Sequence, residues 1–222
     1  MLQIIETPPA LAFENMEWDA KYLEQGVKPC LHLYSWKHEA ATYGYFLSPK
    51  DFFKEGLSLD LARRPTGGGV VFHIWDLAFS FFLPATHPYF YTNSVENYRF
   101  VNKIVWEAVS SFMGERGSFV WEEKGVIEKN VCMAHPTKYD VVVGDKKLIG
   151  AAQRRTKRGY LHQGMISLLM PSREYLERVL IRKEIVDEMF RYTYSLFTDG
   201  DITLLRKEVS ASLQKAFGSV VF

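Results

Sequence analysis

A Gly144-Asp145 pair stands between two short apolar segments, and it constrains the fold more than any other feature of this chain. The flanking segments, residues 139–143 and 147–153, have the composition and length of strands. A Gly-Asp pair suits the positive φ angles of a primed turn, which joins two antiparallel strands. The sequence therefore predicts a β-hairpin here, and with it a sheet that contains antiparallel pairs.

Strands and helices are interspersed along the rest of the chain. Apolar runs predict further strands at residues 30–36, 42–46, 70–72, 77–83 and 162–169. Helical spacing of apolar residues predicts helices at residues 10–25, 94–113, 172–181, 184–195 and 202–216. The fold class that follows is α+β, with a mixed or antiparallel sheet flanked by helices.

Composition excludes several classes of protein. Over 222 residues, Lys+Arg 27 against Asp+Glu 26 leaves a net charge of +1, so we expect neither nucleic acid nor a membrane surface as partner. The two cysteines, Cys30 and Cys132, form neither a disulfide framework nor a metal-site spacing, which favours a cytoplasmic location. We expect no signal peptide, and no apolar run approaches the ~18 residues that indicate a membrane span.

The string RRPTGGG at residues 63–69 is the most unusual in the chain. Successive glycines are entropically costly in ordinary elements, but they offer backbone that a ligand can touch and N–H groups that can surround an oxyanion. The adjacent Arg63 and Arg64 add donors for phosphate or carboxylate. A flexible surface loop with solvated arginines fits the local string equally well.

Lys147 belongs to the return strand of the predicted hairpin, just before the small residues Gly150, Ala151 and Ala152. Strict alternation places Lys147 and Ile149 on one face of that strand. Small residues beside a lysine leave room for a ligand, whereas a lone lysine on an edge strand commonly protects against aggregation. The basic run 146–158 contains no acidic residue, so it fits RNA, an acidic protein partner or a solvated surface. The absence of interleaved aromatic residues disfavours a surface for single-stranded nucleic acid.

Cys132 lies in a loop-like stretch before the hairpin, and Cys30 lies in a strand pattern typical of the core. A reactive thiol needs a neighbouring cation that stabilises the thiolate. The sequence alone leaves open whether Lys147 supplies that cation. His73 and His162 stand near apolar strands, where structural roles are the default, and no metal-ligand spacing is present.

Five strings in order resemble the lipoate–protein ligase A family, within the larger group of biotin and lipoate protein ligases and octanoyltransferases. They are LAFENMEWD at residues 11–19, LYSWKHEAATYG at 33–44, RRPTGGGVVFH at 63–73, the segment 140–153 with its lysine, and LHQG at 161–164. The resemblance implies one catalytic domain over residues 1–222, with a helical tail from about 172 to 222 and no full accessory domain.

The resemblance also implies an activity. Lipoate ligases activate lipoate with ATP, aided by Mg²⁺, and transfer the lipoyl group from lipoyl-AMP to a lysine of a lipoyl domain. Lys147 corresponds to the family's catalytic lysine, and Arg64 is expected to meet the phosphate. The remaining residues implied to bind the lipoyl or adenylate group are Gly67, Gly68, Gly69, His73, Asp140, Gly150, Ala151, His162 and Gly164. The implied partners are lipoyl domains of 2-oxoacid dehydrogenases or the glycine cleavage H protein, with a separate accessory protein or acyl carrier protein as further options.

Two departures keep an alternative open. The run after His73 is shorter than the Asp-x-Gly-Asn of many ligases, and Cys132 precedes the lysine by fifteen residues. Both features resemble cysteine-dependent octanoyltransferases and amidotransferases, which take an octanoyl thioester and need no ATP. Gly69, however, stands where some of those transferases have an arginine. We ranked the ATP-dependent ligase first, the transferase second, and a biotin–protein ligase or a non-catalytic binding module last.

Overall fold

The computed structural model describes residues 1–90, 93–113, 117–119 and 137–222. A mixed sheet of seven strands runs through its centre in the order β1-β2-β6-β10-β9-β8-β7. The bounds are β1 Gln3–Glu6, β2 Cys30–Leu33, β6 Asp76–Pro84, β10 Gly159–Ser167, β9 Lys146–Arg155, β8 Val141–Val143 and β7 Gly117–Phe119. Only β1 and β2 pair in parallel; every other pairing in this sheet is antiparallel.

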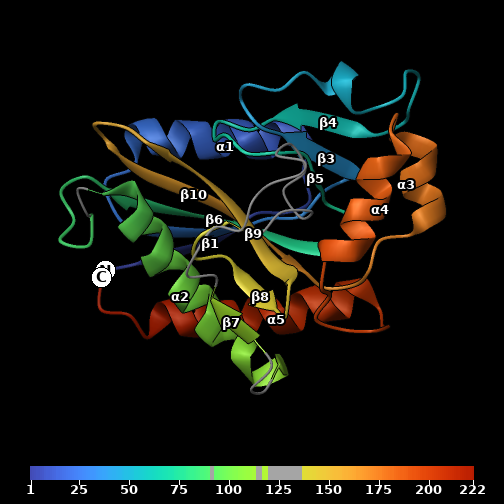
Figure 1. The fold of residues 1–222 in the computed structure, drawn as a ribbon. Helices are drawn as coiled ribbons and strands as arrows, with labels where there is room; N and C mark the ends of the chain where they lie inside the picture. Colours follow the sequence, from blue (N-terminus) through green and yellow to red (C-terminus); the bar gives the residue numbers. More distant parts are fainter. Residues whose placement is uncertain (91–92, 114–116, 120–136) are drawn as a thin grey trace.

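A second, smaller sheet carries the segments that flank the glycine string. Its order is β4-β3-β5, with β4 Asp60–Arg63, β3 Ala40–Tyr43 and β5 Val71–Phe72. The 3-10 turn at Pro49–Asp51, helix α3 Arg173–Val179 and helix α4 Lys183–Tyr192 lie at the same end of the molecule (Figure 1). A cluster of buried side chains that includes Phe53, Phe72, Leu176 and Val186 joins the small sheet to α3 and α4.

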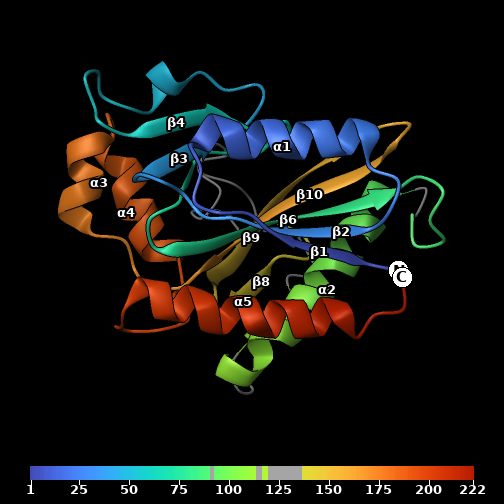
Figure 2. The same cartoon turned by 180° about the vertical axis from the view of Figure 1, so that it is seen from behind.

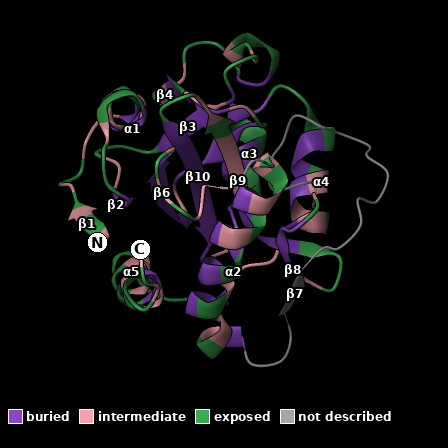
Figure 3. Cartoon of the chain, turned by 90° about the vertical axis from the view of Figure 1, so that its left-hand side faces the viewer, coloured by how far each residue is buried: buried purple, intermediate pink, exposed green. Residues whose placement is uncertain are grey.

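The large sheet lies between two layers. Helices α2 Ser94–Met113 and α5 Ile202–Gly218 cover one face, while α1 Ala12–Gln25 and the small sheet lie over the other, as the two opposite views show (Figures 1 and 2). The strands β6 and β10 in the middle are buried along their whole length (Figure 3). A central strand covered on both faces needs mostly apolar residues on both, and the polar side chains of Ser80 on β6 and Gln163 on β10 are hydrogen-bonded.

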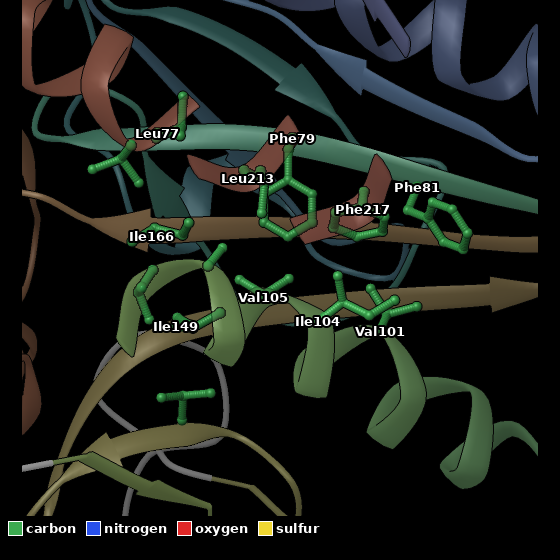
Figure 4. Close-up of a cluster of buried hydrophobic side chains, with 14 of the residues drawn as sticks. Leu77, Phe79, Phe81, Val101, Ile104, Val105, Ile149, Ile166, Leu213 and Phe217 are labelled. Carbon is green, nitrogen blue, oxygen red and sulfur yellow. The ribbon is translucent and has the colours of Figure 1, made fainter. Parts of the chain in front are cut away.

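The main core fills the space between the large sheet and the helices α2 and α5 (Figure 4). Phe79 and Phe81 project from β6 toward this layer, Val105 comes from α2, and Leu213 and Phe217 come from α5. All five side chains are fully buried. The C-terminal helices therefore belong to the domain core, because α5 closes one face of the central sheet.

The predicted α+β class and the flanked mixed sheet are confirmed. The hairpin is present, and Gly144 has a φ of 61°, as a primed turn requires. Strands β1, β4 and β7, of three or four residues at sheet edges, were not predicted from the sequence. Short edge strands carry little apolar patterning because only part of each is covered. Among the described residues, no helix is long and apolar enough to cross a membrane.

Candidate active site

The glycine string forms a loop that Arg64 holds from inside. The Arg64 side chain is buried, and its Nη1 donates to Thr42 Oγ1 at 2.8 Å. Its Nη2 donates to the carbonyl oxygens of Gly67 at 3.1 Å and Gly69 at 2.5 Å. A guanidinium suits this task because its planar fork directs several N–H groups at once. Arg64 thus fixes the loop, and its expected contact with a phosphate stays a prediction.

Close backbone packing explains why the loop needs glycine. A Cβ placed on Gly44 would lie 2.0 Å from the carbonyl oxygen of Gly68, so the chain after β3 passes directly against the loop. Gly68 has a φ of 83°, a conformation that residues with a side chain rarely adopt. A Cβ at Gly68 would also lie 3.2 Å from Cβ of Ala152 on β9. The loop is therefore fitted between β3 and the large sheet.

A cavity of about 310 Å³, partly open to solvent, lies where the loop meets the large sheet. The lining residues come from α1, β2, β3, β5, β9, β10 and the segments next to them: Met16, Tyr34, Thr42, Arg64, Val71, His73, Gly150, Ala151, Ala152, Gln163, Gly164 and Met165. Most of this surface is apolar or small, which suits an acyl chain.

A chain of hydrogen bonds leads from one wall of the cavity to the loop. His73 Nδ1 lies 2.7 Å from Asp76 Oδ2, and His73 Nε2 lies 2.8 Å from Thr42 Oγ1. Thr42 in turn accepts from Arg64, and Trp36 stacks on the His73 ring with centroids 4.2 Å apart. This series couples the position of His73 to that of the glycine loop.

A second buried network ties α1 to the same loop. Gln163 Nε2 donates to Asp19 Oδ2 at 2.6 Å, and Thr66 Oγ1 donates to Gln163 Oε1 at 2.7 Å. The other oxygen of Asp19 lies 3.0 Å from His32 Nδ1, and Ser80 donates to Asp19 as well. Buried polar groups without partners are costly, so a network this complete fixes the relative positions of helix, sheet and loop.

Several of these contributors were missed in the sequence. Gln163 and Asp19 lie inside strings that were compared with the family, yet a buried acid or amide has no distinctive spacing of its own. Tyr34 lines the cavity, and burial raises the pKa of its phenol well above the ordinary value, so it stays neutral and can donate a hydrogen bond. The sequence predicted only that Thr42 lies in a strand. Its role as an acceptor for Arg64 depends on a contact across the small sheet.

A β-bulge sets the direction of Lys147. Val141 pairs with Ile149, but Val142 pairs with Lys147, so β9 has one extra residue at Leu148. Leu148 and Ile149 both belong to the core on the side of α2 and α5. Lys147 therefore shares the opposite face with Gly150, and the expected grouping of Lys147 with Ile149 is wrong. Bulges commonly re-aim a side chain beside a functional site.

Lys147 forms a buried ion pair with Asp140, and neither residue is among those that line the cavity. Its Nζ lies 2.8 Å from Asp140 Oδ2, and the two side chains are 2% and 0% exposed. Asp140 also accepts from the backbone N–H of Thr137 at 2.6 Å and from its hydroxyl at 2.9 Å, and Tyr98 donates to the other carboxylate oxygen. The amine is thus held by a carboxylate that is itself fixed by several donors.

The remaining predicted residues divide into three groups. Arg64, His73, Gly150, Ala151 and Gly164 line the cavity, as their assignment to a binding site requires. Gly67, Gly68 and Gly69 form the loop beside it. His162 is not among the lining residues, and Cys132 lies outside the described residues.

His162 does not face the cavity. Its ring lies on the opposite side of β10, where Nδ1 is 2.9 Å from the hydroxyl of Tyr160 and the ring stacks near Phe79. Its Nε2 is buried and, within the described part of the chain, has no hydrogen-bond partner. Burial lowers the pKa of His162 to about 3, so the ring is neutral at physiological pH.

Cys132 lies outside the described residues. Cys30, the other cysteine, is buried in β2, where burial raises the pKa of its thiol to about 11. The expectation that Cys30 is a core residue is confirmed. No group of three His, Cys, Asp or Glu side chains in the described ranges could hold a metal ion.

Comparison with known proteins assigns this arrangement to a family. The model of the biotin/lipoate A/B protein ligase family matches residues 43–170, which is more than half of the chain. The chain belongs to that family. The matched range contains the glycine loop, the hairpin and the whole of β10.

Two relatives with similar sequences carry the same name, octanoyltransferase LipM. The chain is 31% identical over 183 residues to the octanoyltransferase LipM of Exiguobacterium sp., covering 76% of this chain and 65% of that protein. It is 29% identical over 165 residues to LipM of Carboxydothermus hydrogenoformans, covering 71% and 61%. The chain thus spans less than two thirds of the length of these two relatives. Both relatives are named as octanoyltransferases, so the chain is related to enzymes.

The fold is shared with a solved structure. Protein Ta0514 of T. acidophilum, described as a putative lipoate protein ligase with bound lipoic acid, superposes with a TM-score of 0.71 at 22% identity. The superposition covers 98% of this chain and 84% of Ta0514. The predicted family resemblance and the fold expected from it are therefore confirmed.

The contact between Gly44 and the loop can be tested by one methyl group. We expect Gly44→Ala to lower the free energy of unfolding by about 1–3 kcal/mol, because its Cβ would overlap a backbone oxygen that cannot rotate away. Urea unfolding followed by circular dichroism measures the change. Gly67→Ala is the matched control, since a Cβ there meets nothing within 4 Å. Equal stability of the two variants would contradict the packing described here.

The buried imidazole of His162 predicts a pH dependence of stability. In the unfolded chain His162 binds a proton near its ordinary pKa of 6.5, but in the folded protein only near 3. Stability is therefore lost as the pH falls below about 6.5, by up to ~1.4 kcal/mol per pH unit from this group. We expect His162→Phe to lose less stability than the wild type between pH 6 and pH 4 in urea titrations. Parallel pH profiles of the two proteins would show that His162 does not contribute.

Proposed function

We propose that this protein is an acyltransferase that moves an octanoyl group from a carrier-protein thioester to a lysine of a lipoyl domain. The observation that carries the proposal is the sequence similarity to proteins named octanoyltransferase, at 27–31% identity. The largely apolar cavity, lined on β9 by Gly150, Ala151 and Ala152 just after Lys147, supports it, because a medium-length acyl chain needs such a surface. The ATP-dependent lipoate ligase that the sequence favoured becomes the second candidate.

The charges around the cavity support a neutral thioester over a nucleotide. A second cavity of about 360 Å³ adjoins the first and shares Val71 and Met165 with it. No lysine or arginine of the described chain lines that second cavity, while the buried carboxylate of Asp76 does. Among the described residues that line the first cavity, Arg64 alone is cationic, and it is bonded to Thr42 and the loop. These residues do not fit a triphosphate, which is normally bound by several cationic groups or by Mg²⁺.

The proposed chemistry proceeds through Cys132. Its thiolate attacks the carbonyl carbon of the octanoyl thioester, the bond to the carrier sulfur breaks, and the carrier leaves as a thiol after taking up a proton. The ε-amine of the acceptor lysine then attacks the Cys132 thioester. An amide forms, the cysteine leaves as a thiolate, and the amine releases one proton.

Lys147 is proposed to stabilise the charge that develops in both steps. Each attack converts a carbonyl into an oxyanion, and a fixed cationic donor lowers the energy of that state. The bulge places Lys147 on the face of β9 that carries Gly150, and Asp140 holds its amine in place. Asp140 is thus a positioning residue, whereas Arg64 and His73 maintain the loop and wall that contact the acyl chain.

The acyl donor separates the two candidate functions. We expect octanoyl-acyl carrier protein to support octanoylation of an apo lipoyl domain without ATP, and Cys132→Ser to abolish that activity. Mass spectrometry of the lipoyl domain measures the product. Cys30→Ala is the matched control and should retain activity, because the Cys30 thiol is buried in the core. Modification that requires lipoate and ATP, releases pyrophosphate and survives Cys132→Ser would establish the ligase instead.

The ion pair can be separated from the chemistry by a second set of variants. We expect Lys147→Met to lower the transfer rate by ~10²–10³ and to destabilise the fold by about 3–5 kcal/mol, because it leaves the Asp140 carboxylate buried without its cation. A double variant with Asp140→Asn should recover much of the stability but not the rate. Thermal unfolding and octanoyl transfer are measured on the same preparations. Normal turnover by the double variant would remove Lys147 from the mechanism.

A further inference from the structure

An exposed aromatic pair lies on the outer side of the glycine loop. Tyr45 is 45% exposed and Phe46 is 89% exposed, and their rings meet edge to face with centroids 5.3 Å apart. The guanidinium of Arg63 lies over the Tyr45 ring at 5.1 Å, and that of Arg154 lies over it at 5.7 Å. We call these four residues the Tyr45 patch. Exposed aromatic rings bordered by arginines have the composition of an interaction hot spot.

The Tyr45 patch is attached directly to the loop that forms the cavity. The backbone N–H of Tyr45 donates to the carbonyl of Thr66 at 2.9 Å, and Arg154 Nη1 donates to the carbonyl of Pro65 at 3.2 Å. Thr66 in turn bonds to Gln163, a residue of the cavity wall. A protein bound to this patch would therefore contact the outer surface of the loop while the inner surface holds the acyl group.

The charge of the patch indicates the chemistry of its partner. Arg63 and Arg154 are both exposed, and the next turn along the hairpin adds the exposed residues Lys157 and Arg158. The sequence from Lys146 to Ser172 contains no aspartate or glutamate, so no acidic residue in this segment offsets that charge. Complementarity then requires an acidic surface on the partner, because charged groups across interfaces are arranged to attract.

We propose that the Tyr45 patch docks the acceptor, a protein domain that presents an acidic surface next to the lysine to be modified. This inference rests on the proposed function. The acceptor is chosen because a transferase and a ligase both deliver the acyl group to it, whereas a carrier-protein donor serves only the transferase. The exposed Phe46 ring supplies apolar contact area, and the two arginines orient the acidic surface over the loop.

Arg63→Glu tests the charge of the patch with the least disturbance, since Arg63 is exposed. We expect the KM for an apo lipoyl domain to rise about tenfold, with little change in kcat. Phe46→Ser should raise the same KM severalfold without changing the net charge. Arg178→Glu is the matched control, because Arg178 is an exposed arginine over the ring of Tyr175 on α3 and should leave KM unchanged.

Hydroxylamine provides a readout that bypasses docking. It accepts the octanoyl group as a small nucleophile, so hydroxamate formation by Arg63→Glu should equal that of the wild type. A KM for the lipoyl domain that stays at the wild-type value in both Arg63→Glu and Phe46→Ser would overturn the docking inference. Equal losses with hydroxylamine and with the lipoyl domain would overturn it too, since the patch would then act on the chemistry. A wild-type protein that transfers no octanoyl group to either acceptor would overturn the proposed function itself.

Discussion

The buried guanidinium of Arg64 is the interaction on which the candidate site depends. It sits between the small sheet, through Thr42, and the glycine loop, through the carbonyls of Gly67 and Gly69. A cation placed away from water is costly unless its donors are satisfied. These acceptors satisfy several of its donors and, at the same time, fix the loop against β9. The shape of the cavity follows from this arrangement, because the loop forms one of its walls.

The direction of Lys147 depends on a local irregularity of the backbone. Without the extra residue at Leu148, strict alternation would direct Lys147 into the core between the sheet and α2. The bulge lets two successive residues, Leu148 and Ile149, fill that core while Lys147 turns to the other face. Its cost is one disrupted position in the ladder, and its consequence is an amine held by Asp140 beside Gly150.

The sequence predicted those features that depend on local pattern. The hairpin at Gly144, the helix at residues 94–113 and the predicted α+β class all follow from periodicity and turn chemistry, and the structure has them. Features that depend on tertiary contact were not predictable. The direction of Lys147 depends on a bulge, whereas the role of Arg64 depends on Thr42 from another strand.

His162 is a further residue whose position relative to the cavity was not predicted correctly from the sequence. A motif string placed it among the binding residues, but strand alternation directs Gln163 toward the cavity and His162 away from it. The motif therefore did not indicate which of the two adjacent residues, His162 or Gln163, faces the cavity. The hydrogen bonds of Gln163 to Asp19 and Thr66 give that residue the structural role in the site.

Three buried carboxylates near the site connect its electrostatics to the proposed chemistry. Asp19 bonds to His32, Gln163 and Ser80, Asp76 bonds to His73, and Asp140 pairs with Lys147. Each acid is thus matched locally by donors, and the described residues around the cavity leave little positive charge for a strongly anionic ligand. A neutral thioester and an amine enter such a site without a large desolvation cost, and charge develops only at the reacting carbonyl. Of the three acids only Asp76 is among the described residues that line either cavity, and Asp140 is paired with Lys147, so the scarcity of cationic side chains among the described lining residues is the physical reason to rank the proposed transferase above the ligase.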